Sequence, residues 1–593
     1  MPAPAPDPVP PAAPPRSSRL PTIVRALAWI VLLAAGGVQA WAYRYMPSSA
    51  DSISYLDVAD TYARDGWWAG INGYWSPLYS WILAPVLQGA TAENEIVVVH
   101  VVNFFIYLLA LAAFETFLRE LFRAREPLRA ASPRLRVGWR LVAYAAFAWG
   151  CLRLVPPSLV TPDLVVAALT CLSTALLLRA RRDGARPLTL AAIGCVAGLA
   201  YLAKAAMFPV GFVTLAAASV LAARGGGWRR GVRRGTLALL AFAVVAGPFA
   251  VSLSIVKKRP TFGEVGKLAY AWYVDRVQIF AHWQGGDGYG TPAHPSRVVL
   301  AEPAVYEFAA PVPGTYPAWY DASYWYEGVK PRLDVKATAR VAAVNLAGFV
   351  IRSAWPVLPL LVFLGGLATA GYLRPAERDY WLVLLPLVAT VAMYALVTIA
   401  ARYLGAHLSI LLVATLAGVV PTAKAHRRTT PALLVAAAAA MAVSLVPWGA
   451  QLAALAARGG MPDMGGEVAR ALHARGVPEG ARVGVVGSGQ TAFWARSSRV
   501  RIIAEAPNAR RFWSAPPAEQ AAVLSALTRA GATTVLADNA PGCERTPDWQ
   551  PLGRNTCLWL DANAVSHAPR GRAGGGSRST RRAAVGADRT ESR

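Results

Sequence analysis

Long apolar segments recur along the chain and are separated by short polar connections. Ile23 to Ala42, Ile96 to Phe117 and Leu237 to Ile255 each contain about 20 residues with few or no charges, the length that a helix needs to cross a bilayer. Because such segments recur, they are not signal peptides. The pattern predicts a polytopic α-helical membrane protein with about 11 transmembrane helices.

The longest apolar stretch, residues 188–222, is too long for one crossing and is interrupted only by Lys204 and Pro209. We therefore expect two short spans hinged near these two residues. The other spans are expected at about residues 23–42, 95–118, 139–155, 163–180, 236–256, 343–372, 380–400, 403–420 and 431–449.

The composition changes after Gly459 to that of a small soluble domain, expected over residues 460–565. Strand patterns alternate there with helical patterns, which is typical of an α/β fold. Strands are expected at 482–486, 500–504 and 533–537, and helices at 465–475 and 517–530. Gly487-Ser488-Gly489 follows the first strand, and an ordinary strand-to-helix turn is favoured there over a nucleotide loop.

The two ends of the chain have biased compositions. Residues 1–20 are rich in Pro and Ala, and residues 566–593 are rich in Arg, Gly and Ser. Both are expected to be disordered. The membrane domain is then expected over residues 21–450.

The formal net charge of +26 is concentrated in short connections between apolar segments, such as residues 119–140, 179–186 and 224–234. This is the positive-inside pattern of a cytoplasmic (inner) membrane protein, and it is favoured over nucleic-acid binding. It places the loops 44–94 and 257–342 and the C-terminal domain outside the cytoplasm. Cys543 and Cys557 would lie there, where a disulfide is one of two open alternatives.

Acidic residues follow two of the expected spans on this external side. Asp51 opens a helical pattern in which Asp57, Asp60 and Asp65 are expected on a solvated face. Asp51 is either the N-cap of that helix or a catalytic group. Asp163 is either a second acidic group of a site or part of a common helix start, in which Thr161 is the cap, Pro162 lies in the first turn and the helix dipole favours the carboxylate.

Basic residues at the same membrane face could hold a phosphate. Lys204, Arg402 and Arg352 are the candidates, because a charge at a membrane boundary is costly and is a functional hypothesis by default. Tyr403 could add a hydroxyl donor beside Arg402. The alternative is that these side chains merely extend to the interface.

The external loop 257–342 is rich in Trp and Tyr, which suit either the loop's own core or the binding of a sugar or acceptor. The residues assigned to acceptor or sugar binding are Tyr55, Tyr74, Trp75, Tyr324, Trp325 and Glu327. A metal site at His282, Asp287 and His294 is disfavoured by their irregular spacing, although a divalent cation is left open.

The order of these motifs resembles GT-C glycosyltransferases. The residues that carry the resemblance are Asp51, Tyr74 to Tyr79, Thr161-Pro162-Asp163 and Arg402-Tyr403, within residues 20 to 450. The likeness is to family 39, the polyprenyl-phosphate-sugar-dependent group that includes protein O-mannosyltransferases and the lipid A aminoarabinose transferase. Ser52 follows Asp51 where the protein mannosyltransferases carry an Asp-Glu pair, which argues against a protein serine or threonine acceptor.

The resemblance implies that Asp51 is the catalytic base or positions the acceptor, that Asp163 is the second acidic group, and that Lys204 and Arg402 hold the lipid phosphate. We therefore expect an inverting transfer of a sugar from a polyprenyl-phosphate donor to a lipid, glycan or protein acceptor. A transporter or lipid flippase is the alternative, although no internal repeat is visible. A non-catalytic scaffold is a third.

Overall fold

The structure is a computed structural model that describes residues 20–224, 226–278, 282–286, 288–354, 357–421, 426–538, 548–553 and 556–559. The ends expected to be disordered, residues 1–20 and 566–593, lie outside the described residues except for Leu20, which begins the first helix. Asp287 and Cys543 also lie outside them.

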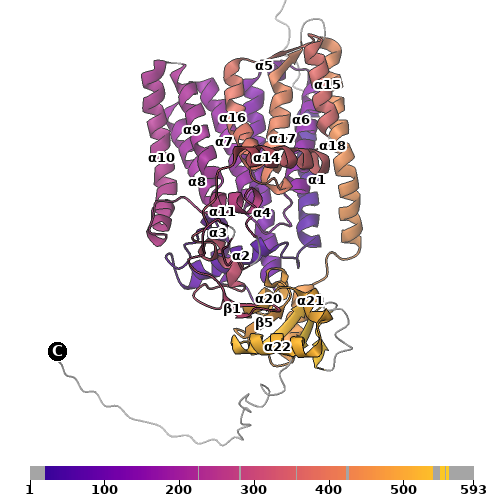
Figure 1. The fold of residues 1–593 in the computed structure, drawn as a ribbon. Helices are drawn as coiled ribbons and strands as arrows, with labels where there is room; N and C mark the ends of the chain where they lie inside the picture. Colours follow the sequence, from indigo (N-terminus) through magenta and orange to yellow (C-terminus); the bar gives the residue numbers. More distant parts are fainter. Residues whose placement is uncertain are drawn as a thin grey trace, which may run out of the picture.

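A bundle of upright helices forms most of the molecule (Figure 1). Within the described ranges, seven helices are long and apolar enough to cross a membrane. They are α1 (Leu20–Ala42), α4 (Glu95–Ala124), α7 (Asp163–Asp183), α9 (Met207–Ala223), α10 (Gly227–Val256), α17 (Ala401–Gly418) and α18 (His426–Ala457). Four shorter or less apolar helices lie alongside: α6 (Pro133–Ala148), α8 (Pro187–Ala203), α15 (Leu358–Thr369) and α16 (Arg378–Ala395). The polytopic helical fold is confirmed.

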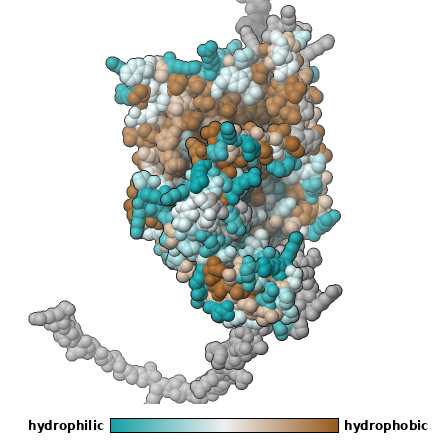
Figure 2. Space-filling model, in the orientation of Figure 1, coloured by the Kyte–Doolittle hydropathy of each residue, from teal (hydrophilic) through white to brown (hydrophobic). Residues whose placement is uncertain are grey.

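Apolar side chains cover the middle of the bundle, and hydrophilic residues gather at both ends (Figure 2). Ile30 on α1, Phe105 on α4 and Val244 on α10 are among the large apolar residues that remain exposed. Exposed apolar side chains of this size on several helices are expected where a protein faces lipid rather than water.

The expected hinge in residues 188–222 is present. Helix α8 ends at Ala203, Lys204 has an extended backbone with φ −156°, and α9 begins at Met207. Lys204 lies in this break, and its side chain extends to Asp163, the first residue of α7.

The single span expected at 343–372 is wrong. Helix α14 (Val335–Phe349) begins earlier and lies across the upright helices, a π-helical turn (Val350–Ala354) follows, and only α15 is upright (Figure 1). Arg340 and Arg352 are exposed along this segment. Hydropathy reports apolar content and not helix direction, so it did not reveal the turn.

Short helices cover the end of the bundle that carries the C-terminal domain. They are α2 (Ala50–Arg64), α3 (Pro77–Leu87), α11 (Val265–Tyr273), α12 (Pro317–Tyr320) and α13 (Ala322–Trp325). The opposite end carries α5 (Glu126–Arg129) and a two-stranded sheet of β3 (Leu373–Pro375) and β4 (Val419–Pro421).

The C-terminal domain is built on a seven-stranded sheet with the order β1-β2-β6-β5-β7-β9-β8. Strands β6, β5 and β7 are parallel, and the outer pairs are antiparallel. The strands are β1 (Arg297–Leu300), β2 (Val305–Glu307), β5 (Arg482–Val486), β6 (Arg501–Ala506), β7 (Thr534–Asp538), β8 (Trp549–Pro551) and β9 (Thr556–Trp559). The helices are α19 (Met464–Ala474), α20 (Phe493–Ser497), α21 (Ala509–Ser514) and α22 (Pro517–Arg529).

The three expected strands and two expected helices are confirmed as β5, β6, β7, α19 and α22. The sheet, however, also contains β1 and β2, which belong to the long loop 257–342. Strand β2 pairs with β6 through Tyr306 opposite Glu505. The loop and the C-terminal domain therefore share one sheet and one core.

The described cysteines are of two kinds, free thiols in the membrane domain and a disulfide-bonded cysteine in the C-terminal domain. Cys151 and Cys171 are buried free thiols, and Cys195 is free and half-buried. Cys557 is disulfide-bonded and buried in β9. Its expected partner, Cys543, lies outside the described residues.

Candidate active site

Four charged residues from four separate chain segments meet at the end of the bundle that carries the C-terminal domain. Asp51 lies in the first turn of α2, and Asp163 is the first residue of α7. Lys204 lies in the break between α8 and α9, and Arg402 is in the first turn of α17. All four were candidates from the sequence.

Arg402 links the two carboxylates. Its Nη2 donates to Asp51 Oδ2 at 2.5 Å, and its Nε lies 3.8 Å from Asp163 Oδ2. Lys204 Nζ donates to Asp163 Oδ1 at 2.6 Å. Two negative and two positive groups therefore form one continuous, electrically balanced cluster.

The helix-cap interpretation of Asp51 is wrong, because Ser49 occupies the N-cap of α2. The carboxylate of Asp51 instead accepts from Arg402 and, at 3.3 Å, from the indole Nε1 of Trp319. Pro162 is the N-cap of α7, and Thr161 Oγ1 donates to Asp163 Oδ2 at 2.8 Å. Neither aspartate is accounted for by local helix capping.

The two carboxylates differ in exposure. The Asp163 side chain is 3% exposed, whereas the side chains of Asp51, Arg402 and Lys204 are 20%, 21% and 19% exposed. Asp51 and both cations are therefore partly accessible to solvent. Asp163 lies behind them, where it orients the two cations.

Tyr403 contributes the face of its ring. Lys204 Nζ lies 3.7 Å from the ring centroid, and the guanidinium of Arg402 lies 5.3 Å from it. Tyr394 stacks on Tyr403 with centroids 4.9 Å apart, and Lys204 Nζ lies 5.8 Å from the Tyr394 centroid. The ring holds the ammonium by a cation–π contact.

Aromatic residues form the wall next to Asp51. Tyr74 contacts Trp75, Trp272 and Trp319 with ring centroids 4.5, 5.7 and 5.4 Å away. Burial raises the pKa of Tyr74 and of Tyr55, and the nearby carboxylate of Asp51 raises both further. Trp319 was one of many aromatic residues in the loop sequence, and nothing local marked it as the partner of Asp51.

The remaining loop candidates lie in a different cluster. Tyr324 stacks on His294 at 4.1 Å, and His294 Nε2 lies 3.1 Å from Glu327 Oε2. Trp325 Nε1 donates to the carbonyl of Pro317. None of the contacts in the described part of the chain joins these three candidates to Asp51.

Two further sequence candidates lie elsewhere. Arg352 is exposed on the π-helical turn. His282 Nε2 donates to Glu505 Oε1 at 2.8 Å, and His294 instead lies beside Glu327. Among the described residues, no group of three or more His, Cys, Asp or Glu side chains is arranged to hold a metal.

Sequence reasoning missed a buried ion cluster that holds helix α2 from its other side. Arg496 of α20 donates to Asp57 at 2.7 Å and to Glu95 at 3.0 Å, and it lies 2.7 Å from Asp60. Arg499 adds a contact of 3.3 Å to Asp60. Asp57 and Asp60 are therefore not on a solvated face, as their spacing had predicted.

The long loop also joins this cluster. Asp57 accepts from both the backbone N and Oγ1 of Thr315, at 2.7 and 2.8 Å. Burial raises the pKa of Asp57, and Arg496 opposes that shift. The preceding residue, Gly314, has φ +100°, and a Cβ there would lie 3.0 Å from the Asp57 carboxylate. Only glycine fits this close turn without strain.

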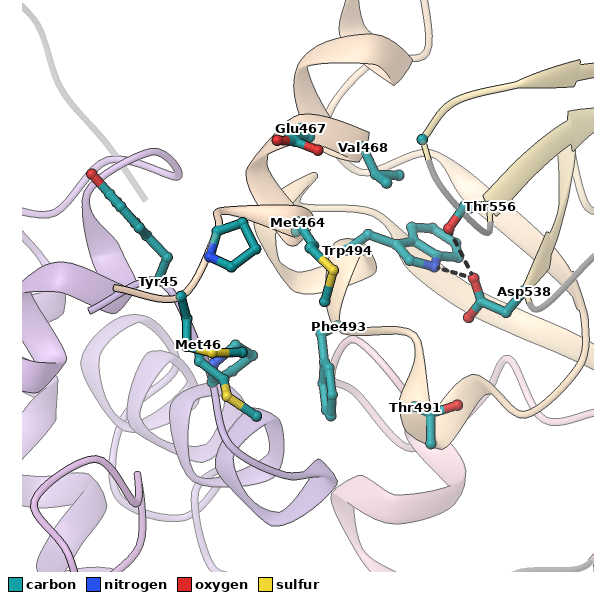
Figure 3. Close-up of a pocket in the computed structure, with 15 residues that line it drawn as sticks. Tyr45, Met46, Met464, Glu467, Val468, Thr491, Phe493, Trp494, Asp538 and Thr556 are labelled. Atoms are coloured by element: carbon teal, nitrogen blue, oxygen red, sulfur yellow. Dashed lines mark hydrogen bonds between the residues drawn. The ribbon is translucent and has the colours of Figure 1, made fainter. Parts of the chain in front are cut away.

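A cavity of about 340 Å³ separates the C-terminal domain from the segment that leads to Asp51 (Figure 3). Met46, Met464 and Phe493 give it apolar walls, while Asp538 accepts hydrogen bonds from Trp494 and Thr556 at its edge. Burial raises the pKa of Asp538 to about 6.

No protein-family model matches the sequence, and neither does any curated protein. Solved structures do match. The crystal structure of ArnT from Cupriavidus metallidurans bound to undecaprenyl phosphate is 13% identical, with a TM-score of 0.49, over 92% of this chain and 98% of that one. The apo oligosaccharyltransferase from Archaeoglobus fulgidus is 12% identical, with a TM-score of 0.41, over 86% and 69%.

A third similar structure is AglB from Archaeoglobus fulgidus in complex with an inhibitory peptide and a dolichol-phosphate. It is 12% identical, with a TM-score of 0.36, over 87% of this chain and 69% of that one. The roles of the site residues rest on the contacts described above.

Proposed function

We propose that this protein is a membrane glycosyltransferase that moves a sugar from a polyprenyl-phosphate donor to an acceptor hydroxyl at the extracytoplasmic face of the membrane. The observation that carries the proposal is the position of Arg402 between Asp51 and Asp163, with Lys204 on the far side. A base that is partly exposed and two cations within one cluster are what a displacement at a sugar phosphate requires.

In this reaction the acceptor oxygen attacks the anomeric carbon from the side opposite the phosphate. The new C–O bond forms as the bond between the anomeric carbon and the phosphate oxygen breaks, so the configuration inverts. Asp51 takes the acceptor proton, and polyprenyl phosphate leaves with the bond's electron pair. Arg402 and Lys204 neutralise the leaving phosphate, and Asp163 keeps both cations oriented.

The sidedness of the proposal follows from charge. The arginines of residues 119–140, 179–186 and 224–234 lie at the end of the bundle opposite Asp51. By the positive-inside tendency that end is cytoplasmic, so the charged cluster and the C-terminal domain face outward.

The test compares Asp51→Asn with Asp65→Asn, which removes an exposed carboxylate from the end of the same helix. Purified full-length protein in vesicles is supplied with a radiolabelled polyprenyl-phosphate sugar and a cell-envelope extract as the acceptor source. We expect Asp51→Asn to lower transfer by about 10²- to 10⁴-fold, as expected when a general base is lost, and Asp65→Asn to have no effect.

Binding of undecaprenyl phosphate distinguishes the base from the phosphate-binding groups. Asp51→Asn should still bind this lipid, whereas Arg402→Gln and Lys204→Gln should bind it more weakly. Full transfer by Asp51→Asn would refute the mechanism. Equal lipid binding by Arg402→Gln and the wild type would refute the phosphate site.

A further inference from the structure

A second charged cavity lies at the end of the bundle opposite Asp51. It has a volume of about 330 Å³ and is formed by the last turns of α4, by α5 and by the start of α6. Its lining includes five arginines and one carboxylate, Glu115. The arginines are Arg119, Arg123, Arg129, Arg136 and Arg140.

Glu115, the one carboxylate in the lining, and the neighbouring Glu120 are already paired. Glu115 is buried and accepts from Tyr144 at 2.5 Å, with Arg119 at 3.4 Å and Arg25 at 3.7 Å. Glu120 pairs with Arg123 and with Arg182. The cavity therefore keeps a large positive excess after its ion pairs are counted.

Three of the arginines make no ion pair with any described residue. Arg129 and Arg136 are exposed, and the Nε of Arg140 is buried without a hydrogen-bond partner. An unpaired buried guanidinium N–H is costly, so it favours a bound acceptor. Arg140 also lies over the ring of Phe122, with its Cζ 5.7 Å from the centroid.

The remaining wall is apolar. Leu118 and Leu128 are buried, and Phe122 is half-buried between the arginines. The cavity holds roughly the volume of ten waters, which is enough for a phosphodiester group and its glycerol. An apolar wall beside guanidinium groups at a membrane end suits an amphiphile better than a free anion.

We propose that this cavity, which we call the arginine pocket, binds the headgroup of an anionic phospholipid. The guanidinium groups of Arg129, Arg136 and Arg140 hold the phosphate, because their planar forks match its oxygen pairs. Leu118 and Phe122 contact the glycerol and the upper acyl chain. The site is independent of the proposed reaction, which takes place at the other membrane face.

The test measures lipid binding to the full-length protein in neutral detergent by native mass spectrometry. Dioleoyl phosphatidylglycerol is the probe, dioleoyl phosphatidylcholine is the zwitterionic comparison, and inorganic phosphate is the headgroup-only comparison. The wild type should bind the anionic lipid about tenfold more tightly than the zwitterionic one, given the contribution of each basic residue to anionic-lipid attraction.

Two double variants with the same loss of charge give the control. Arg129→Gln with Arg136→Gln should abolish the preference for the anionic lipid. Arg229→Gln with Arg233→Gln, which removes two exposed arginines from α10 at the same end of the bundle, should preserve it. Each variant is first checked for monodispersity and for undecaprenyl phosphate binding.

Three results would overturn the proposal. An equal loss in both double variants would show that diffuse charge attracts the lipid. Equal binding of the two lipids by the wild type would show that the site does not recognise the net negative charge of the headgroup. Displacement of the anionic lipid by inorganic phosphate at equal concentration would identify a small-anion site instead.

Discussion

At the scale of single residues, the charged cluster shows how one side chain serves two partners. Arg402 is shared between Asp51 and Asp163, so each carboxylate lowers the cost of placing the guanidinium at the membrane boundary. The same sharing leaves Arg402 ready to exchange Asp51 for a phosphate oxygen pair. The geometry therefore predicts separate roles for the ring and the hydroxyl of its neighbour, Tyr403.

Tyr403→Phe should keep transfer within about threefold of the wild type, because the ring face that contacts Lys204 at 3.7 Å is retained. Tyr403→Ala should lower transfer by about tenfold or more, since Lys204 loses that contact. Rates measured at saturating donor check both variants. A large loss in Tyr403→Phe would show instead that the hydroxyl is the functional group, as the sequence had suggested.

Asp538 should make stability depend on pH. Its folded pKa of about 6 is above the usual value near 3.9, so folding favours the protonated form. Stability from this group is present at low pH and is lost as the pH rises from about 4 to about 6, by at most about 3 kcal/mol.

The comparison is with Asp538→Asn, which keeps an acceptor for Trp494 and Thr556 but does not ionise. We expect the difference between the Tm of this variant and that of the wild type to become more positive as the pH rises from 4 to 7, because only the wild type ionises at position 538. Asp57 and the other groups titrate alike in both proteins. Parallel Tm curves over this range would contradict the assignment.

At the scale of elements, helix α2 is held from two sides. Asp51 meets Arg402 of the bundle, and Asp57 and Asp60 meet Arg496 of the C-terminal domain. Arg496 is a positioning residue, since it fixes the helix that carries Asp51 without contacting Arg402 or Lys204. Helix α2 thereby connects α20 to the carboxylate of Asp51.

Arg496→Met should destabilise the fold by about 3–5 kcal/mol, because three carboxylates lose their shared cation. It should also lower transfer, and Arg496→Lys should restore part of both losses. Arg510→Met, which removes an exposed arginine from α21, is the control. Thermal unfolding and transfer rates provide the two readouts, and equal Tm values for Arg496→Met and Arg510→Met would contradict the role.

Several elements were predictable because their signals are local. The apolar segments located the upright helices, and counting them placed Asp51, Asp163, Lys204 and Arg402 at one membrane face. The alternating patterns after Gly459 located β5, β6 and β7. What these elements share is that hydropathy and turn residues within about 20 positions determine them.

The parts that the sequence did not reveal depend on distant partners. Arg496 is one of many arginines, and its pairing with Glu95 joins positions separated by most of the chain. Strands β1 and β2 are short and lie in an aromatic loop, so no periodicity marked them. The hydrogen bond from the indole of Trp319 to Asp51 joins residues far apart in the chain, so the residues next to Trp319 gave no sign of it.

At the scale of the whole molecule, the C-terminal domain is part of the site's frame and not an appendage. It supplies Arg496 to α2 and strand β6 to the loop, while Glu505 accepts from His282, Tyr316 and the backbone of Gly489. The buried carboxylate thus ties the loop to the sheet at two points, His282 and Tyr316, and also holds Gly489 within the domain.

Deletion of residues 460–593 should therefore abolish transfer and expose the loop around residues 297–307 to protease, since β2 loses its partner strand. Deletion of residues 566–593 is the control and should leave both properties unchanged. Limited proteolysis with mapping of the cut sites checks the prediction. A protected loop in the larger deletion would show that it folds without the domain.

The shared sheet also sets an order of events during synthesis. Tyr306 pairs with Glu505, which is synthesised 199 residues later. Strand β2 therefore cannot pair with β6 until four more membrane helices and part of the domain have been synthesised. Until then, β2 presents an open edge, which is a template for pairing with other chains. A chain truncated before Arg501 would leave this edge unpaired, and the exposed strand would be a target for cellular quality control.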